Sequence, residues 1–72
     1  MDSTTRKAFA DWCRSEREVN QRLVDRLSSG TMKTGKNDGS GWVDTTAESL
    51  AVSKRIVADM DDLIPKIEAD HA

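Results

Sequence analysis

The glycines of this chain lie in one short stretch, and their placement divides the sequence into three parts. All 4 glycines of the 72 residues fall between positions 30 and 41, and the long segments on either side contain none. Glycine disfavours the interior of regular elements because it loses more backbone freedom on folding than any other residue. The distribution therefore predicts two long regular elements joined by an irregular connection.

The first segment, residues 3–29, has the spacing of an amphipathic helix. It contains neither Gly nor Pro, and its residues are mostly good helix formers. Its apolar side chains recur three, four or seven positions apart, which is the spacing of one helical face. They are Phe9, Trp12, Val19, Leu23 and Leu27.

The second segment, residues 45–70, repeats this pattern with Leu50, Val57, Met60, Ile64 and Ile67. Its start resembles a capping box, in which Thr45 and Glu48 each satisfy the other's free backbone N–H. We predict Thr45 as the N-cap, with Asp44 as the alternative. Pro65 lies inside the pattern and has no N–H to donate, which predicts a kink or a break over residues 61–64.

Two polar residues, Glu16 and Asn20, fall inside the apolar stripe of the first helix. A carboxylate on a buried face needs a partner, because an unpaired charge is costly to remove from water. Antiparallel packing is expected to bring both residues opposite residues 53–57. We therefore predict a contact between Glu16 and Lys54, and assign these polar residues to setting the helix register, as in coiled coils.

These segments predict a single all-α domain, an antiparallel two-helix hairpin with a long Gly-rich loop over residues 30–44. The apolar arc of the second helix spans about 160°, which is wider than one neighbouring helix covers. A homodimer that closes a four-helix bundle is the simplest way to bury it, although a helical hetero-partner would serve equally. The predicted interface residues are Phe9, Trp12, Val19, Leu23, Leu50, Ile56, Val57, Met60, Leu63, Ile64 and Ile67.

Composition narrows the possible environments of the chain. The formal net charge is −2 and the pI is about 5.2, so there is no overall basic field to attract nucleic acid or anionic membranes. One cysteine allows no internal disulfide, which favours a reducing compartment. No apolar run is long enough for a membrane span or a signal peptide. We expect a cytoplasmic protein without membrane contacts.

Motifs for catalysis, cofactors or metals fail when their context is checked. Residues 30–36 fit the start of a phosphate-binding loop, but Asn37 stands where Ser or Thr must hold magnesium, and a helix precedes the loop where a strand is required. Residues 37–48 have glycines where a calcium loop needs oxygen ligands. Cys13 and His71 lack paired ligand spacing, and Cys13 is better interpreted as a small core residue. We expect no enzyme activity, cofactor or metal.

The connection over residues 30–44 is the part with the most functional potential. It is about as long as helix connections become before they are either functional or disordered. Residues 32–34 and 40–43 are predicted to pair as a small hairpin around a turn at residues 37–39. Lys33, Lys36 and Trp42 are candidate contact residues. Trp42 is interpreted either as a hydrophobic staple on the second helix or as an exposed anchor for a partner.

The sequence favours a small non-enzymatic protein-interaction or adaptor protein that acts through its apolar helical faces and its loop. The alternative is a small dimeric regulator that binds nucleic acid through basic residues of the first helix and the loop. That helix carries six basic residues, but five acidic residues dilute them to a net charge of about +1. Nucleic-acid binding is therefore the less favoured alternative, although it is not excluded.

Overall fold

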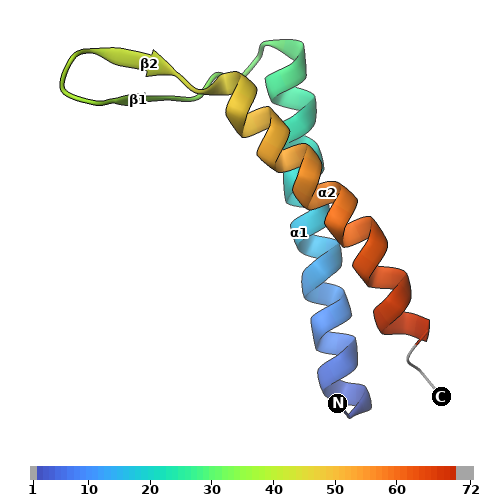
Figure 1. Cartoon of the computed structure of the whole chain (residues 1–72). Helices are drawn as coiled ribbons and strands as arrows, with labels where there is room; N and C mark the ends of the chain where they lie inside the picture. Colours follow the sequence, from blue (N-terminus) through green and yellow to red (C-terminus); the bar gives the residue numbers. More distant parts are fainter. Residues whose placement is uncertain (1, 70–72) are drawn as a thin grey trace.

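The computed structural model describes residues 2–69, and within them two long helices lie side by side in opposite directions. Helix α1 spans Ser3–Ser29 and helix α2 spans Thr46–Ala69. Between them, strands β1 (Gly35–Asn37) and β2 (Trp42–Asp44) form a small antiparallel ribbon that projects from one end of the helix pair (Figure 1). The predicted all-α helical hairpin with a long connection is confirmed.

Helix α1 begins and ends where the sequence predicted. At its start, the Asp2 carboxylate accepts a hydrogen bond of 2.7 Å from the N–H of Thr5, and this bond lowers the pKa of Asp2. At its end, Gly30 adopts the left-handed conformation with φ of 82°. The carbonyl of Arg26 then accepts the N–H groups of Gly30 and Thr31, which satisfies the last turn of the helix.

Helix α2 begins at Thr46, directly after the predicted N-cap Thr45, whose carbonyl accepts the N–H of Ser49 at 2.9 Å, but its first turn is not closed by the predicted capping box. The Thr45 hydroxyl and N–H both bond to Thr34 instead of to Glu48, at 3.0 and 2.9 Å. Asp44, the alternative cap, accepts the N–H of Thr46 at 2.9 Å. Of the kink or break predicted over residues 61–64, the break is wrong, because α2 continues through Pro65 to Ala69, and the kink stays a prediction.

The β-ribbon lies further along the chain than predicted. Residues 35–37 pair with 42–44, so that Asn37 is opposite Trp42 and Gly35 is opposite Asp44. The side chains of Asn37 and Asp38 each accept an N–H two residues ahead, which places the turn at residues 38–41. Thr34, expected in the first strand, is instead bound to the start of α2.

The hydrophobic core is small and lies toward the end of the helix pair that carries the termini. Its buried residues are Ala10, Cys13 and Ile67, and Cys13 has no exposed surface, in agreement with the prediction of a core residue. Half-buried side chains pack around this cluster. They are Phe9, Met60, Leu63 and Ile64.

The molecule is long and thin, with principal extents of 54 × 25 × 14 Å. Its radius of gyration is 16.1 Å, whereas a compact domain of 72 residues has about 11 Å. A helix with its side chains is about 10–12 Å across. The smallest extent therefore corresponds to one layer of helices, with no second layer on either side.

Candidate protein-interaction surface

One side of the helix pair is closed by ion pairs between the helices. Arg14 of α1 contacts Glu68 of α2, and Arg17 contacts Asp61. The bond to Asp61 raises the pKa of the Arg17 guanidinium above its ordinary value. All four side chains are about half exposed, so these pairs contribute little stability but determine which flanks of the two helices meet.

The other flank of α1 is apolar. Cys13 and Asn20 are buried against α2, and neighbouring residues on a helix are 100° apart. Arg14, which follows Cys13, therefore lies on the ion-paired side. Trp12 and Val19 precede the two buried residues and lie on the opposite side, where 54% and 52% of their surfaces are exposed.

The same argument applies to α2. Ser53 and Ile67 are its buried residues, and Glu68, which follows Ile67, lies on the ion-paired side. Val52 precedes Ser53 and therefore lies on the opposite flank, with 58% of its surface exposed. Both helices thus present hydrophobic side chains on one side. We name this the apolar face, and its residues are Phe9, Trp12, Val19, Val52, Ile56 and Leu63.

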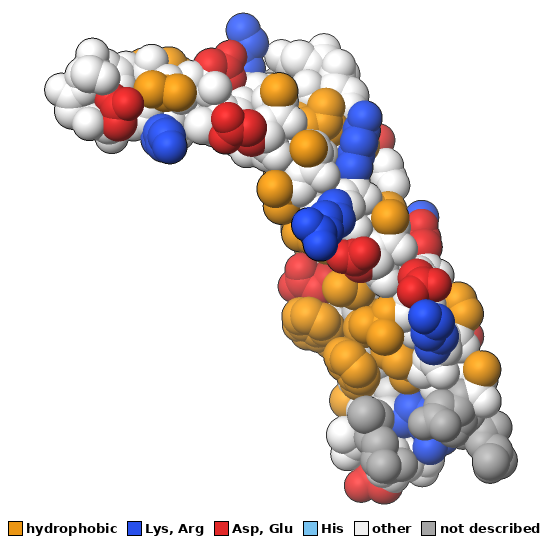
Figure 2. Space-filling model, viewed as in Figure 1, with side chains coloured by type: hydrophobic (Ala, Val, Ile, Leu, Met, Phe, Trp, Pro, Cys, Tyr) orange, Lys and Arg blue, Asp and Glu red, His pale blue; other side chains and the backbone are white. Residues whose placement is uncertain are grey.

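Hydrophobic side chains gather on the lower half of the helix pair in Figure 2, along the flank toward which the β-ribbon projects. Phe9 and Trp12 of the apolar face stack on each other, with ring centroids 6.2 Å apart. Such a stack presents a broad and rigid apolar surface, because aromatic side chains have few rotatable bonds.

The remaining predicted interface residues lie elsewhere. Met60, Ile64 and Ile67 face the seam between the helices and belong to the core or its edge. Val57 lies four residues before Asp61 and therefore on the ion-paired side. Leu50 lies two helical turns before Val57, so it lies on the same side. The predicted wide apolar arc of α2 is thus divided between the seam and both flanks.

The predicted contact between Glu16 and Lys54 is wrong. Among the described residues 2–69, no ion pair joins Glu16 to Lys54, and Lys54 is exposed. The ion pair of Arg17 with Asp61 shows why, because Lys54 lies about two turns before Asp61 and is too far along α2 to reach Glu16. Asn20 is buried and donates to the Glu16 carbonyl of its own helix at 2.8 Å.

A groove of about 430 Å³ continues the apolar face at the end that carries the β-ribbon. Val52 belongs to both surfaces, and Leu23 and Leu27 provide the facing wall from α1. Polar side chains close its end beneath the ribbon. The full lining is Leu23, Leu27, Thr34, Thr45, Glu48, Ser49, Val52 and Ser53.

Thr34 connects this groove to the β-ribbon. Its hydroxyl lies 2.7 Å from the hydroxyl of Ser49 and 3.0 Å from that of Thr45. Its backbone N–H donates to the Thr46 hydroxyl at 3.1 Å, and its carbonyl accepts the N–H of Thr45. These bonds fix the base of the ribbon to the first turn of α2. Sequence reasoning missed this role of Thr34.

The predicted loop residues are all accessible. Lys33 and Lys36 are exposed, and Trp42 has 70% of its surface exposed, the largest fraction among the large hydrophobic residues described. The Trp42 indole lies over Gly35 of the neighbouring strand, where any larger side chain would collide with the ring. Trp42 is therefore not a staple on α2.

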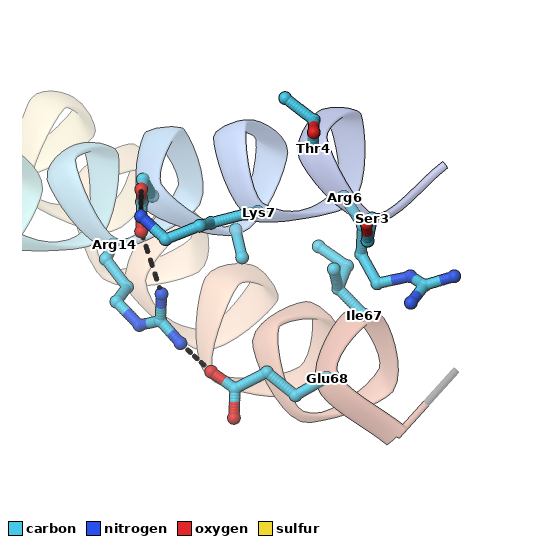
Figure 3. A pocket seen from close by; sticks show the side chains of 9 residues that line it. Ser3, Thr4, Arg6, Lys7, Arg14, Ile67 and Glu68 are labelled. Carbon is cyan, nitrogen blue, oxygen red and sulfur yellow. Dashed lines mark hydrogen bonds and ion pairs between the residues drawn. The ribbon is translucent and has the colours of Figure 1, made fainter. Parts of the chain in front are cut away.

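A second hollow, of about 650 Å³, lies between the start of α1 and the end of α2 (Figure 3). Three basic side chains line it, Arg6, Lys7 and Arg14, and two acidic side chains lie among them: Arg14 contacts Asp11 and Glu68, and Lys7 contacts Asp11. The hollow therefore does not form a concentrated anion site.

Residues 2–69 contain no cluster of three or more His, Cys, Asp or Glu that could hold a metal ion. In the same part of the chain, neither helix is apolar enough over a sufficient length to cross a bilayer. His71 lies outside the described residues, as does Asp70, the predicted end of α2. Comparisons with protein-family models, with curated proteins and with solved structures found no match to this chain.

Proposed function

We propose that this chain is a protein-interaction module that works as a homodimer, in which two helix pairs pack through their apolar faces into a four-helix bundle. The single observation that carries the proposal is a hydrophobic flank on a molecule only 14 Å thick. Helices bury their apolar stripes by packing in at least two layers, and this chain supplies one. A second copy provides the missing layer with the same geometry.

The exposed area supports the same proposal quantitatively. A folded monomer of 8.0 kDa exposes about 4,450 Å², whereas this chain exposes 5248 Å², a surplus of about 800 Å². A standard protein interface removes about 800 Å² from each partner. The surplus is of the size that one partner copy would cover, and it arises from the elongated shape as a whole, including the exposed β-ribbon.

The charges favour this proposal over nucleic-acid binding. Among the basic residues of α1, Lys7 and Arg22 contact acidic residues four positions away, and Arg14 and Arg17 contact α2. Phosphate binding would have to replace these ion pairs, and its affinity would fall steeply with salt. Lys33 also lies near a carboxylate, that of Asp44, whose pKa is lowered first by the hydrogen bonds of Thr46 and to a smaller extent by Lys33.

The test is the dimer dissociation constant of Val19→Asp, measured by analytical ultracentrifugation. Val19 is half exposed in the single chain, so a carboxylate there leaves the intramolecular core intact but would be buried in the dimer. We expect the dissociation constant to rise by at least about tenfold.

The matched control is Ala58→Asp, which adds the same charge at an exposed position on the outer side of α2. Its dissociation constant should stay within about twofold of the unmodified chain. If both variants raised the dissociation constant equally, the added charge would weaken the dimer wherever it is placed, and the result would contradict the proposed interface. An unchanged dimer in Val19→Asp would contradict the proposed interface.

A further inference from the structure

We infer that the β-ribbon of each copy reaches across the proposed dimer, so that Trp42 of one copy fills the groove formed by Leu23, Leu27 and Val52 of the other. This inference rests on the proposed homodimer. It assigns the occupant of the groove, and it requires the two ribbons to lie at the same end of the assembly.

The structure of the β-ribbon leaves the side chain of Trp42 exposed to solvent. Its strands pair with each other and the base is fixed by Thr34, but the ribbon projects away from both helices (Figure 1). The indole lies over Gly35, which keeps the ring on one face of the ribbon. An aromatic side chain in this position has its apolar area exposed and little conformational freedom to lose on binding.

The groove is apolar and large enough to hold the Trp42 side chain of another copy. Leu23 and Val52 make its walls apolar together with Leu27, of which only 6% is exposed, and its volume of about 430 Å³ admits an indole ring. Val52 is 58% exposed although it lies beside the buried Ser53, so the groove is open to a partner. The Trp42 ring of the same chain does not occupy the groove, because it lies over Gly35.

The position of the groove selects a second copy as the source of the indole. The groove joins the apolar face through Val52, so a copy packed on that face lies beside it. The ribbon projects toward the flank on which the hydrophobic side chains gather (Figure 2). In a two-fold dimer whose axis runs along the helices, each ribbon therefore points toward the groove of the other copy.

The first test uses the 2 tryptophans of the chain as separate reporters. Trp12→Phe leaves Trp42 as the fluorophore, and Trp42→Phe leaves Trp12. We expect the emission of both variants to shift to shorter wavelength as concentration rises through the dimer dissociation constant, because both indoles leave water.

The outcomes separate this inference from the proposed function. A concentration-dependent shift of Trp12 with constant, water-exposed emission of Trp42 would mean that the dimer forms without ribbon exchange, which overturns the inference alone. Constant emission of both residues would overturn the homodimer as well.

The second test is a cross-link between separate chains. Chains with Trp42→Cys are mixed with chains carrying Val52→Cys and oxidised, and the buried native Cys13 is not accessible for exchange. We expect a disulfide-linked pair of the two chain types. The control replaces Trp42→Cys by Val43→Cys, since neighbouring strand residues point to opposite faces of the ribbon. Equal linkage from both positions, or none from Trp42→Cys, would overturn the inference.

Discussion

The two ends of the helix pair are held together by different forces. At the end that carries the termini, Ala10, Cys13 and Ile67 form a buried hydrophobic cluster. At the ribbon end, hydrogen bonds of Thr34 with Thr45, Thr46 and Ser49 hold the connection against α2. Hydrophobic burial therefore stabilises the first end, and directional polar contacts together with the buried Leu27 stabilise the second.

This difference explains why apolar surface remains available near the ribbon. Trp42, Val43 and Val52 are all exposed there, whereas at the other end the half-buried hydrophobic residues pack around a core and Trp12 remains 54% exposed beside it. The polar anchor positions the connection, and of the described hydrophobic residues at this end only Leu27 is buried. The ribbon end is thus ordered and at the same time supplies apolar groups for a partner.

The largest expected effect comes from removing the core at the terminal end. Ile67→Ala should lower the free energy of unfolding by about 2–5 kcal/mol, because it removes a buried side chain and leaves a cavity. Urea denaturation at fixed protein concentration measures this loss. Ile67→Val is the graded control, at about 0.5–1.5 kcal/mol. Equal effects of the two substitutions would show that Ile67 does not carry the core.

A smaller effect is expected at the polar anchor. Thr34→Val keeps the shape of the side chain but removes its hydroxyl, so the hydroxyls of Thr45 and Ser49 lose a partner. The free energy of unfolding should fall by about 1–3 kcal/mol, with faster hydrogen exchange at the start of α2. The exposed Thr4→Val serves as control, within about 0.5 kcal/mol. If Thr34→Val behaves like this control, the anchor is not stabilising.

The ion pairs between the helices should matter less than either end. A double-mutant cycle of Arg17→Ala and Asp61→Ala should give a coupling energy of about 0–1 kcal/mol that shrinks with added salt, because both side chains are about half exposed. A coupling above about 2 kcal/mol would mean that this flank is shielded from water, contrary to the half exposure of these side chains.

The smallest predicted effect is a pH dependence at the start of α2. Thr46, through its side chain and its N–H, lowers the pKa of Asp44 below the ordinary value of 3.8. The stabilisation is therefore fully present above pH 3.8 and is lost as the pH falls through the lower pKa of the folded chain. An NMR titration of the Asp44 carboxyl checks this, and a pKa at or above 3.8 would contradict the contact.

The helices could be predicted because their signals are local. The clustered glycines and the regular apolar spacing specify α1 from Ser3 to Ser29, as predicted, and the start of α2 within one residue. The contact of Glu16 with Lys54 failed for another reason. It depended on the register between the helices, which Arg17 and Asp61 show to be different from the one assumed.

The candidate surface was only partly predictable. Trp12 and Val19 were correctly placed among the apolar residues of the first helix, but periodicity does not show which flank the second helix covers. The ion pairs supplied that information. The role of Thr34 had no local signal, because its partners Thr45 and Ser49 lie more than ten residues away in the sequence.

Sedimentation equilibrium of the unmodified chain, from micromolar to millimolar concentration, tests the central claim most directly. The claim is that a second copy covers the apolar face of a single helical layer. The account predicts a reversible change from the mass of one chain, 8.0 kDa, to twice that mass, without larger species. A mass of 8.0 kDa at every concentration would contradict it.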